Sequence, residues 1–443
     1  MFFGASGTLA RANQQTMFNA PLRFVSLLLF AAPAAFAVAA IDFDRELVLT
    51  PQAGAASEDV EIRHWQARAS AATATTADFE RLGWAFVAKA RRTLDGAYYT
   101  LAEKTADASD GRFGASAEMR LLRGHVFHNE HRFHEAEKLA RGLAAERGAP
   151  EDWALLSDAL MEQGKLAEAV ESLQRMANLK PGLEASSRIA QLRWLKGDLR
   201  GAVAAMEEAA RATSPRDAEA AAWTLTRLAG FYLQAGRLDA ARNATDAAAK
   251  HASDFPPALL MGGRVLLAMN RSADALAPLR RAAELNPLPE YQWWLADALR
   301  ASGHEEEAIA VERVITTRGA ASDPRTLALF LATRRENVAL AVRLARGELE
   351  NRGDVLTRDA LAWTLAASGD LAAAAAESHA ALAEHTADAR IYFHAGEIAA
   401  ACGQREAAEK FFAEARPLAA ALTPSERTAL DRHAPPTALA RTR

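Results

Sequence analysis

The residues best suited to do chemistry lie in a histidine-rich segment, residues 125–134, which reads HVFHNEHRFH and holds four of the chain's 11 histidines. A spacing of three places His125 and His128 on one face of a helix, where neutral imidazoles could bind zinc, nickel or copper. Glu130 or His131 could complete the ligand set. However, the helical register around this segment places His131 in a turn, so four ligands could converge only if that turn were rearranged. Divalent-metal binding therefore stands as the alternative hypothesis for function.

Patterns typical of catalytic sites are absent from the sequence. It has no glycine-rich phosphate loop after a strand, no nucleophile elbow and no His-Glu-x-x-His helix. Acidic runs such as residues 304–307 are best interpreted as solvated helix faces. A third hypothesis, an enzyme on a helical frame, would need a catalytic domain, and no segment outside the repeats described below is long enough to hold one. We therefore expect neither enzymatic activity nor a cofactor.

The composition indicates a large apolar core. Half of the 443 residues are hydrophobic and the net charge is only -4, which does not favour nucleic acid as a partner. The single cysteine, Cys402, excludes an internal disulfide and is interpreted as a small core residue.

The N-terminus resembles a secretory signal peptide. Arg23 precedes the apolar run 24–32, and small residues follow at positions 35, 37 and 39. This order predicts a signal peptide over residues 1–40, cleaved near residues 37–40, although an uncleaved anchor helix is the alternative. Translation from Met17 would give an ordinary signal, so residues 1–16 are a candidate for a misassigned start. We expect a soluble protein in the periplasm or outside the cell, with no stable membrane insertion after cleavage.

The remaining chain divides into three parts. Residues 41–77 lack sustained periodicity and are predicted to be a flexible linker. Folded structure is expected over residues 78–432, with a C-terminal capping helix from about residue 424, and residues 433–443 are expected to be a disordered tail.

Residues 78–432 repeat a pattern with a period of 33 or 34 residues, apart from one step of 39. Glycine recurs at the fifteenth position of six units, where a turn between two helices needs a positive φ. Counted from Pro150, one unit has the following residues at positions 4, 7, 11, 15, 20, 24 and 32: Trp153, Leu156, Leu160, Gly164, Ala169, Leu173 and Pro181. This spacing resembles the tetratricopeptide repeat family.

The same phase continues through most of the chain. Small residues occupy position 8 or 20 where two helices must cross closely, for example Gly263 and Ala275 in the unit that starts at Pro256. A gap of twice the period predicts a degenerate unit over residues 322–354, with Leu329 and Ala341 at these two positions. The resemblance implies an all-α, right-handed superhelical solenoid of antiparallel helix pairs, with about nine to ten units.

Members of this family usually bind peptides on the concave face of the superhelix, through positions 2, 5, 9, 12 and 13 of each first helix. Mapping these positions also gives Glu151, Glu162, Gln191, Arg300, Asp359 and Arg390, and the candidate groove residues chosen from the mapping are Asp158, Trp194, Trp223, Arg264, Trp293, Asp297, Trp363, Phe393 and Glu397. The alternative is that several of the tryptophans belong to the core, because a phase error of one residue would bury them. The paired Lys and Asn with which chaperone-docking members clamp a C-terminal carboxylate are missing. The sequence thus predicts an exported scaffold that binds a protein or peptide, and leaves the partner and the oligomeric state open.

Overall fold

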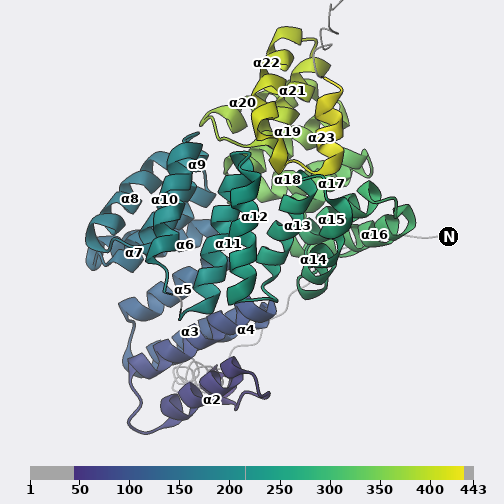
Figure 1. The fold of residues 1–443 in the computed structure, drawn as a ribbon. Coiled ribbons are helices and arrows are strands. Elements are labelled where there is room, and N and C mark those ends of the chain that lie inside the picture. Colours follow the sequence, from purple (N-terminus) through teal and green to yellow (C-terminus); the bar gives the residue numbers. More distant parts are fainter. Residues whose placement is uncertain (1–43, 215, 434–443) are drawn as a thin grey trace, which may run out of the picture.

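The computed structural model describes residues 44–214 and 216–433, which consist of helices and connecting loops (Figure 1). The predicted signal peptide, residues 1–40, and residues 434–443 of the predicted tail lie outside the described residues. Within the described residues, the helices from α3 to α22 form ten successive pairs. The pairs are α3 (Thr76–Thr93) with α4 (Ala97–Phe113), α5 (Ala117–Asn129) with α6 (Phe133–Glu146), α7 (Pro150–Glu162) with α8 (Leu166–Leu179), α9 (Leu183–Leu195) with α10 (Leu199–Ala212), α11 (Ala218–Gln234) with α12 (Leu238–His251), α13 (Pro256–Ala268) with α14 (Ser272–Leu285), α15 (Pro289–Ala301) with α16 (Glu305–Ser322), α17 (Pro324–Arg334) with α18 (Val338–Asn351), α19 (Val355–Ser368) with α20 (Leu371–Leu382), and α21 (Ala389–Ala401) with α22 (Arg405–Ala415).

The predicted all-α solenoid of nine to ten hairpin units is therefore confirmed. The small residues act as their positions predict: a methyl group added to Gly263 would lie 2.4 Å from Cγ of Leu279 on the second helix of the pair. The degenerate unit is the pair α17 and α18, in which Leu329 and Ala341 are both buried. Close helix crossing thus recurs even where the repeat pattern is weak.

The predicted flexible linker, residues 41–77, is wrong for much of its length. Residues 57–70 form α2 (Ser57–Ser70), which packs against α3. Ile62 and Ala69 are fully buried in one apolar cluster with Phe79. The folded region therefore begins before residue 78.

Hydrophobic periodicity did not predict α2 because the buried face of this helix carries polar side chains. Asp59 is buried and forms an ion pair with Lys89 of α3. Gln66 is also buried, and its amide donates hydrogen bonds to the carbonyl oxygens of Val48 and Thr50, at 2.9 and 2.6 Å. Since a carboxylate and an amide occupy inward positions, hydrophobic periodicity does not reveal this helix.

After α22 the chain continues into a 3-10 turn, η1 (Arg416–Ala421), and a last helix, α23 (Pro424–Asp431). Thr423 and Glu426 form a capping box at the start of α23. Rather than extending the solenoid, α23 packs against α15. His433, the first residue of the predicted tail, stacks on Phe412 at 4.1 Å between ring centres.

The solenoid closes on itself. Two loops of the C-terminal half, residues 352–354 and 383–388, which we call the closing loops, contact the turns of the hairpins α7–α8 and α9–α10. Trp194 donates its indole N–H to the carbonyl oxygen of Ala387 at 2.9 Å, and Thr386 donates its hydroxyl to that of Leu195 at 2.6 Å. Figure 1 shows the yellow-green C-terminal hairpins against the upper ends of α9 to α13.

Apolar burial supports this closure. Val355, Ala381 and Ile391 belong to the same apolar cluster as Leu155 and Leu195 of the N-terminal half. At α23, the guanidinium of Arg427 donates to the carbonyl oxygen of Leu267 at 2.8 Å. The C-terminal hairpins are therefore held by core contacts as well as by surface contacts.

No helix in the part of the chain that the structure describes is both long and apolar enough to cross a membrane.

Candidate functional site

The closed solenoid encloses a cavity of about 440 Å³. It is lined by first helices of successive hairpins, from α9 to α21, by Asp388 of a closing loop and by one residue of η1. Five aromatic side chains contribute to its wall: Trp194, Phe231, Tyr291, Trp293 and Trp294. The wall also includes seven charged residues, and a volume of this size is typical of a ligand-binding cavity.

Of the nine predicted groove residues, three line this cavity: Trp194, Arg264 and Trp293. Trp194 and Trp293 are largely buried, with 8% and 5% of their surface exposed. Both therefore serve two purposes, because each presents part of its ring to the cavity and packs the remainder within the protein.

The other six do not line the cavity. Asp158 is paired with Arg188 through two hydrogen bonds of 2.8 and 2.7 Å. Trp223 is exposed, and Glu397 contacts Nε2 of His433 at 2.6 Å. Asp297, Trp363 and Phe393 are held in contacts beside the cavity, which are described next.

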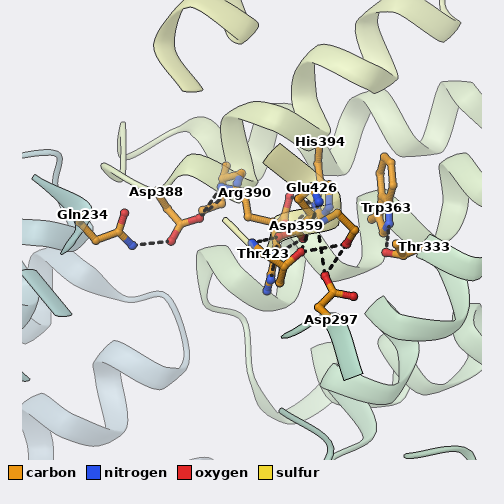
Figure 2. A network of polar contacts seen from close by, with 12 residues as sticks. Gln234, Asp297, Thr333, Asp359, Trp363, Asp388, Arg390, His394, Thr423 and Glu426 are labelled. Atoms are coloured by element: carbon orange, nitrogen blue, oxygen red, sulfur yellow. Dashed lines mark hydrogen bonds and ion pairs between the residues drawn. The ribbon is translucent and has the colours of Figure 1, made fainter. Parts of the chain in front are cut away.

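A polar network joins the C-terminal helices at the cavity wall, to which its members Asp359 and Arg390 belong (Figure 2). Nδ1 of His394 lies 2.9 Å from Asp359, and the His394 ring stacks on Trp363 at 4.1 Å between ring centres. Phe393 contacts Trp363 with its ring at 6.3 Å. Since both His394 and Asp359 are buried, this group orients α19 against α21.

The network also attaches α23. Arg390 donates to both carboxylate oxygens of Glu426, at 2.6 and 3.2 Å. Burial opposes ionisation of Glu426, but the charge and hydrogen bonds of Arg390 outweigh it and lower the pKa of this carboxyl group. Asp297 has only hydroxyl and backbone partners, chiefly Ser425, so burial raises its pKa. Asp297 is thus a structural contact of α23 instead of a groove residue.

Four arginines line the cavity, and they differ in how their charge is balanced. Arg390 is paired with Glu426, and Arg325 lies 3.5 Å from Asp354. Arg264 lies 3.6 Å from the carboxylate of Glu290, and its Nε has no hydrogen-bond partner among the described residues. Arg227 hydrogen-bonds to the amide oxygen of Gln191, and no carboxylate of the described residues lies within 4.0 Å of it.

Mapping by position missed Arg227, Phe231, Tyr291 and Trp294. Position 6 of the first helix supplies Arg227 and Trp294, as well as Met261. Positions 2, 5, 6, 9, 12 and 13 form one continuous stripe at helical spacing, so adding position 6 to the family's set would have found Arg227 and Trp294.

The metal hypothesis for His125, His128 and His131 is wrong for this geometry. His125 packs its edge against Trp84, and burial lowers its pKa to about 4. The rings of His128 and His131 both contact Phe133, at 5.3 and 5.5 Å, and a positive φ of 60° places His131 in the turn. No three His, Cys, Asp or Glu side chains within residues 44–214 and 216–433 are arranged to hold a metal ion.

Comparison with known proteins gives one family match: residues 260–324 match the family model described as tetratricopeptide repeat. None of the curated proteins matches the chain. Among solved structures, the chain is similar to the human IFIT1 dimer with PPP-AAAA, with 12% identity, a TM-score of 0.48, and 86% of this chain and 99% of that chain covered. It is also similar to PilF of Pseudomonas aeruginosa, with 19% identity, a TM-score of 0.35, and 45% and 90% covered.

The matched residues 260–324 span the hairpins α13–α14 and α15–α16. The same hairpin, with small residues at its crossing points, recurs on both sides of them. Tetratricopeptide repeats are generally non-catalytic scaffolds that bind protein or peptide partners. Residues 260–324 therefore match tetratricopeptide repeats, and the hairpins on both sides of them have the same helix-pair fold.

Proposed function

We propose that the protein is an exported, non-catalytic scaffold that holds a peptide segment of a partner protein in its central cavity. The observation that carries this proposal is the cavity itself, which is lined by the first helices of successive repeats and by five aromatic side chains. Tryptophan and tyrosine give large contact areas at small entropic cost, which suits the anchoring of a peptide.

The closure limits what can enter. The closing loops contact the turns of α7–α8 and α9–α10, and the cavity inside the closed solenoid, about 440 Å³, is too small for a folded domain. A short extended segment fits better, because it can place alternate side chains against the aromatic wall.

Photo-crosslinking in cells tests the proposal. A photoreactive phenylalanine analogue replaces Met261, which lines the cavity, and in a matched control it replaces Val170 on α8, which is 41% exposed and outside the cavity. We expect a partner protein that crosslinks from position 261 and not from position 170. A partner captured only from position 170 would place binding on the outer surface and refute the cavity as the site.

Export is a separate part of the proposal and rests on the sequence of residues 1–40. N-terminal sequencing of the protein purified from its native cells should find a mature chain that starts near residues 38–41. A chain that retains the apolar run 24–32 would refute cleavage.

A further inference from the structure

The last segment of the described chain, residues 416–433, contains η1 and α23, and we call it the clasp (Figure 1). One side of the clasp packs on the last hairpin, where Leu422 and Leu430 are buried in one apolar cluster with Phe393 and Phe412. The other side faces the middle of the solenoid, since η1 packs against α11 and α13, and α23 packs against α15. The clasp therefore joins the last hairpin to hairpins that lie far before it in the sequence.

The contacts of the clasp with the middle of the solenoid are polar or involve small side chains. Ser425 donates its hydroxyl to the carboxylate of Asp297, and Arg427 donates to the carbonyl oxygen of Leu267 at 2.8 Å. Ala420 packs against the apolar cluster that α11, α12 and α13 share. Because an alanine buries little apolar area, the hydrophobic effect contributes little on this side of the clasp.

The buried carboxylate of Asp297 opposes this closed position. Asp297 is only 4% exposed, and the groups that hold its carboxylate are hydroxyl and backbone groups of residues 423 and 425. Burial, and to a smaller extent the charge of Glu426, raises the pKa of Asp297. An ionised carboxylate that is buried without a cation costs free energy, and this cost exists only while the clasp covers it.

The closing loops are held differently, because the residues next to them belong to a core. Val355 and Ile391 lie in the same apolar cluster as Leu155 of α7. The solenoid thus has two closures of unlike chemistry, an apolar one at the closing loops and a mainly polar one at the clasp. Ala421 of η1 lines the cavity, so the polar closure is also part of the cavity wall.

We infer that the clasp is a gate: its contacts with α11, α13 and α15 open to admit a ligand to the cavity, while the closing loops stay in place. Two of the contacts that open join residues 128 and 160 positions apart, so their release leaves the packing within each hairpin intact. Release also removes Ala421 from the wall and uncovers Asp297. The nature of the ligand rests on the proposed function, whereas the opening of the clasp can be measured without a ligand.

Hydrogen exchange of the full mature chain at low urea concentrations tests the opening. Amides of α23 should exchange through a local opening, at rates that urea hardly changes, because such an opening exposes little surface. Amides of α9 and α15 should exchange more slowly, at rates that rise steeply with urea. The gate would be overturned if the amides of α23 had the same rates and the same urea dependence as those of α15, because the clasp would then open only on global unfolding.

Variants distinguish opening of the gate from fraying of a terminal helix. Arg427→Gln removes a charged donor to the end of α13 and should raise the exchange rates of α23 about tenfold. Asp297→Asn removes the buried charge and should lower these rates, whereas fraying would not respond to a residue of α15. Arg432→Gln is the matched control and should change nothing, since Arg432 is exposed on the same segment. If Asp297→Asn left the rates unchanged or raised them, the inference would be overturned, because the buried carboxylate would not oppose the closed position.

Access to the cavity is measured with a thiol. Met261→Cys, in a chain that also carries Cys402→Ala, places the sole cysteine in the cavity wall. Its reaction with a maleimide on a polyethylene glycol chain should be faster with Arg427→Gln and slower with Asp297→Asn. A control cysteine in place of Val170, which is exposed outside the cavity, should react at the same rate in every variant. Equal rates at position 261 in all variants would place the entrance elsewhere and overturn the gate.

The gate and the proposed function can fail separately. If no partner crosslinks from position 261 but the exchange and thiol rates change as expected, peptide binding in the cavity is refuted and the gate is retained. If a partner crosslinks from position 261 and these rates do not change, the proposed function stands and the gate is refuted.

Discussion

The turns at Gly197 and Gly303 have the same backbone conformation, with φ of 81° at both glycines, but they lie in different surroundings. A methyl group added to Gly197 would lie 2.6 Å from the carbonyl oxygen of His385 in a closing loop, whereas nothing lies within 4 Å of the same position at Gly303. Gly164 resembles Gly197, since Gly353 of the other closing loop approaches it. Glycine at this position of the repeat therefore has two roles. It allows a positive φ in the turn, and, in the turns where the solenoid closes, its missing side chain leaves room for a closing loop.

The largest effect is expected where closure buries an aromatic ring. Trp194→Ala removes a ring that is 8% exposed, together with its hydrogen bond to the carbonyl oxygen of Ala387. Loss of a buried aromatic side chain should lower the free energy of unfolding by about 3–5 kcal/mol. Urea denaturation measures this, and hydrogen exchange should show faster exchange in residues 383–388.

Trp223→Ala is the matched control, because Trp223 is 40% exposed and lies outside the cavity. It should cost roughly 1 kcal/mol or less, since most of the area that truncation removes is already in contact with water. Equal losses for both variants would contradict the view that Trp194 belongs to the closure.

The contrast between these two tryptophans marks what could be predicted from the sequence. Helix pairs, turns and crossing points depend on residues less than about 34 positions apart, and the spacing of Gly263 and Ala275 was enough to predict them. The contact between Trp194 and Ala387 spans 193 residues. It depends on small rotations that accumulate over the intervening hairpins, and the residues of any single repeat do not determine their sum.

The candidate site was predicted in part for the same reason. The repeat phase places Trp194, Arg264 and Trp293 on the inner face, where the structure has them. It places Asp297 there as well, but α23 folds back and covers this side chain. Which inner positions remain open thus depends on segments far away in the sequence.

The next effect distinguishes the two kinds of turn. Gly303→Ala should lower the free energy of unfolding by about 1–2 kcal/mol, the cost of a left-handed conformation for alanine. Gly197→Ala carries the same cost, and the overlap with His385 should add about 1–3 kcal/mol, as overpacking does. Urea denaturation of both variants gives the difference. If the two losses were equal, the closing loop would not approach Gly197 as closely as the structure has it.

Two aspartates from the predicted groove set should respond to pH with opposite signs. Burial opposes ionisation of Asp158, but Arg188 outweighs it and keeps the pKa below its usual range. The stabilisation by Asp158 is therefore present above the unfolded pKa of about 3.9 and is lost as the pH falls. Asp158→Asn should cost about 1–2 kcal/mol at pH 7, and this loss should shrink at acidic pH.

For Asp297 the sign reverses. Burial raises its pKa in the folded protein, so its favourable contribution is present below the unfolded pKa and is lost as the pH rises through the folded pKa. Asp297→Asn should therefore be more stable than the parent protein at pH 7, and the gain should shrink as the pH approaches 4. Melting temperatures between pH 4 and 8 measure both variants. A loss of stability at pH 7 in Asp297→Asn would mean that Ser425 and Thr423 compensate the buried charge in full.

The smallest effect is expected for the exposed ion pair that spans the same closure. Lys196 lies 2.7 Å from Glu384, and both side chains are at least one-third exposed. Solvent screens such a pair, so Lys196→Gln should cost between about 0 and 1 kcal/mol and even less at high salt. Thr386→Val removes a buried hydrogen bond a few residues away and should cost about 1–2 kcal/mol at any salt concentration, because the carbonyl oxygen of Leu195 would lose a partner. Urea denaturation at low and high salt compares the two variants. A larger, salt-sensitive loss of unfolding free energy in Lys196→Gln than in Thr386→Val would mean that surface charge holds the closing loop. The burial of Trp194 and Thr386 would then be a consequence of closure and would not stabilise it.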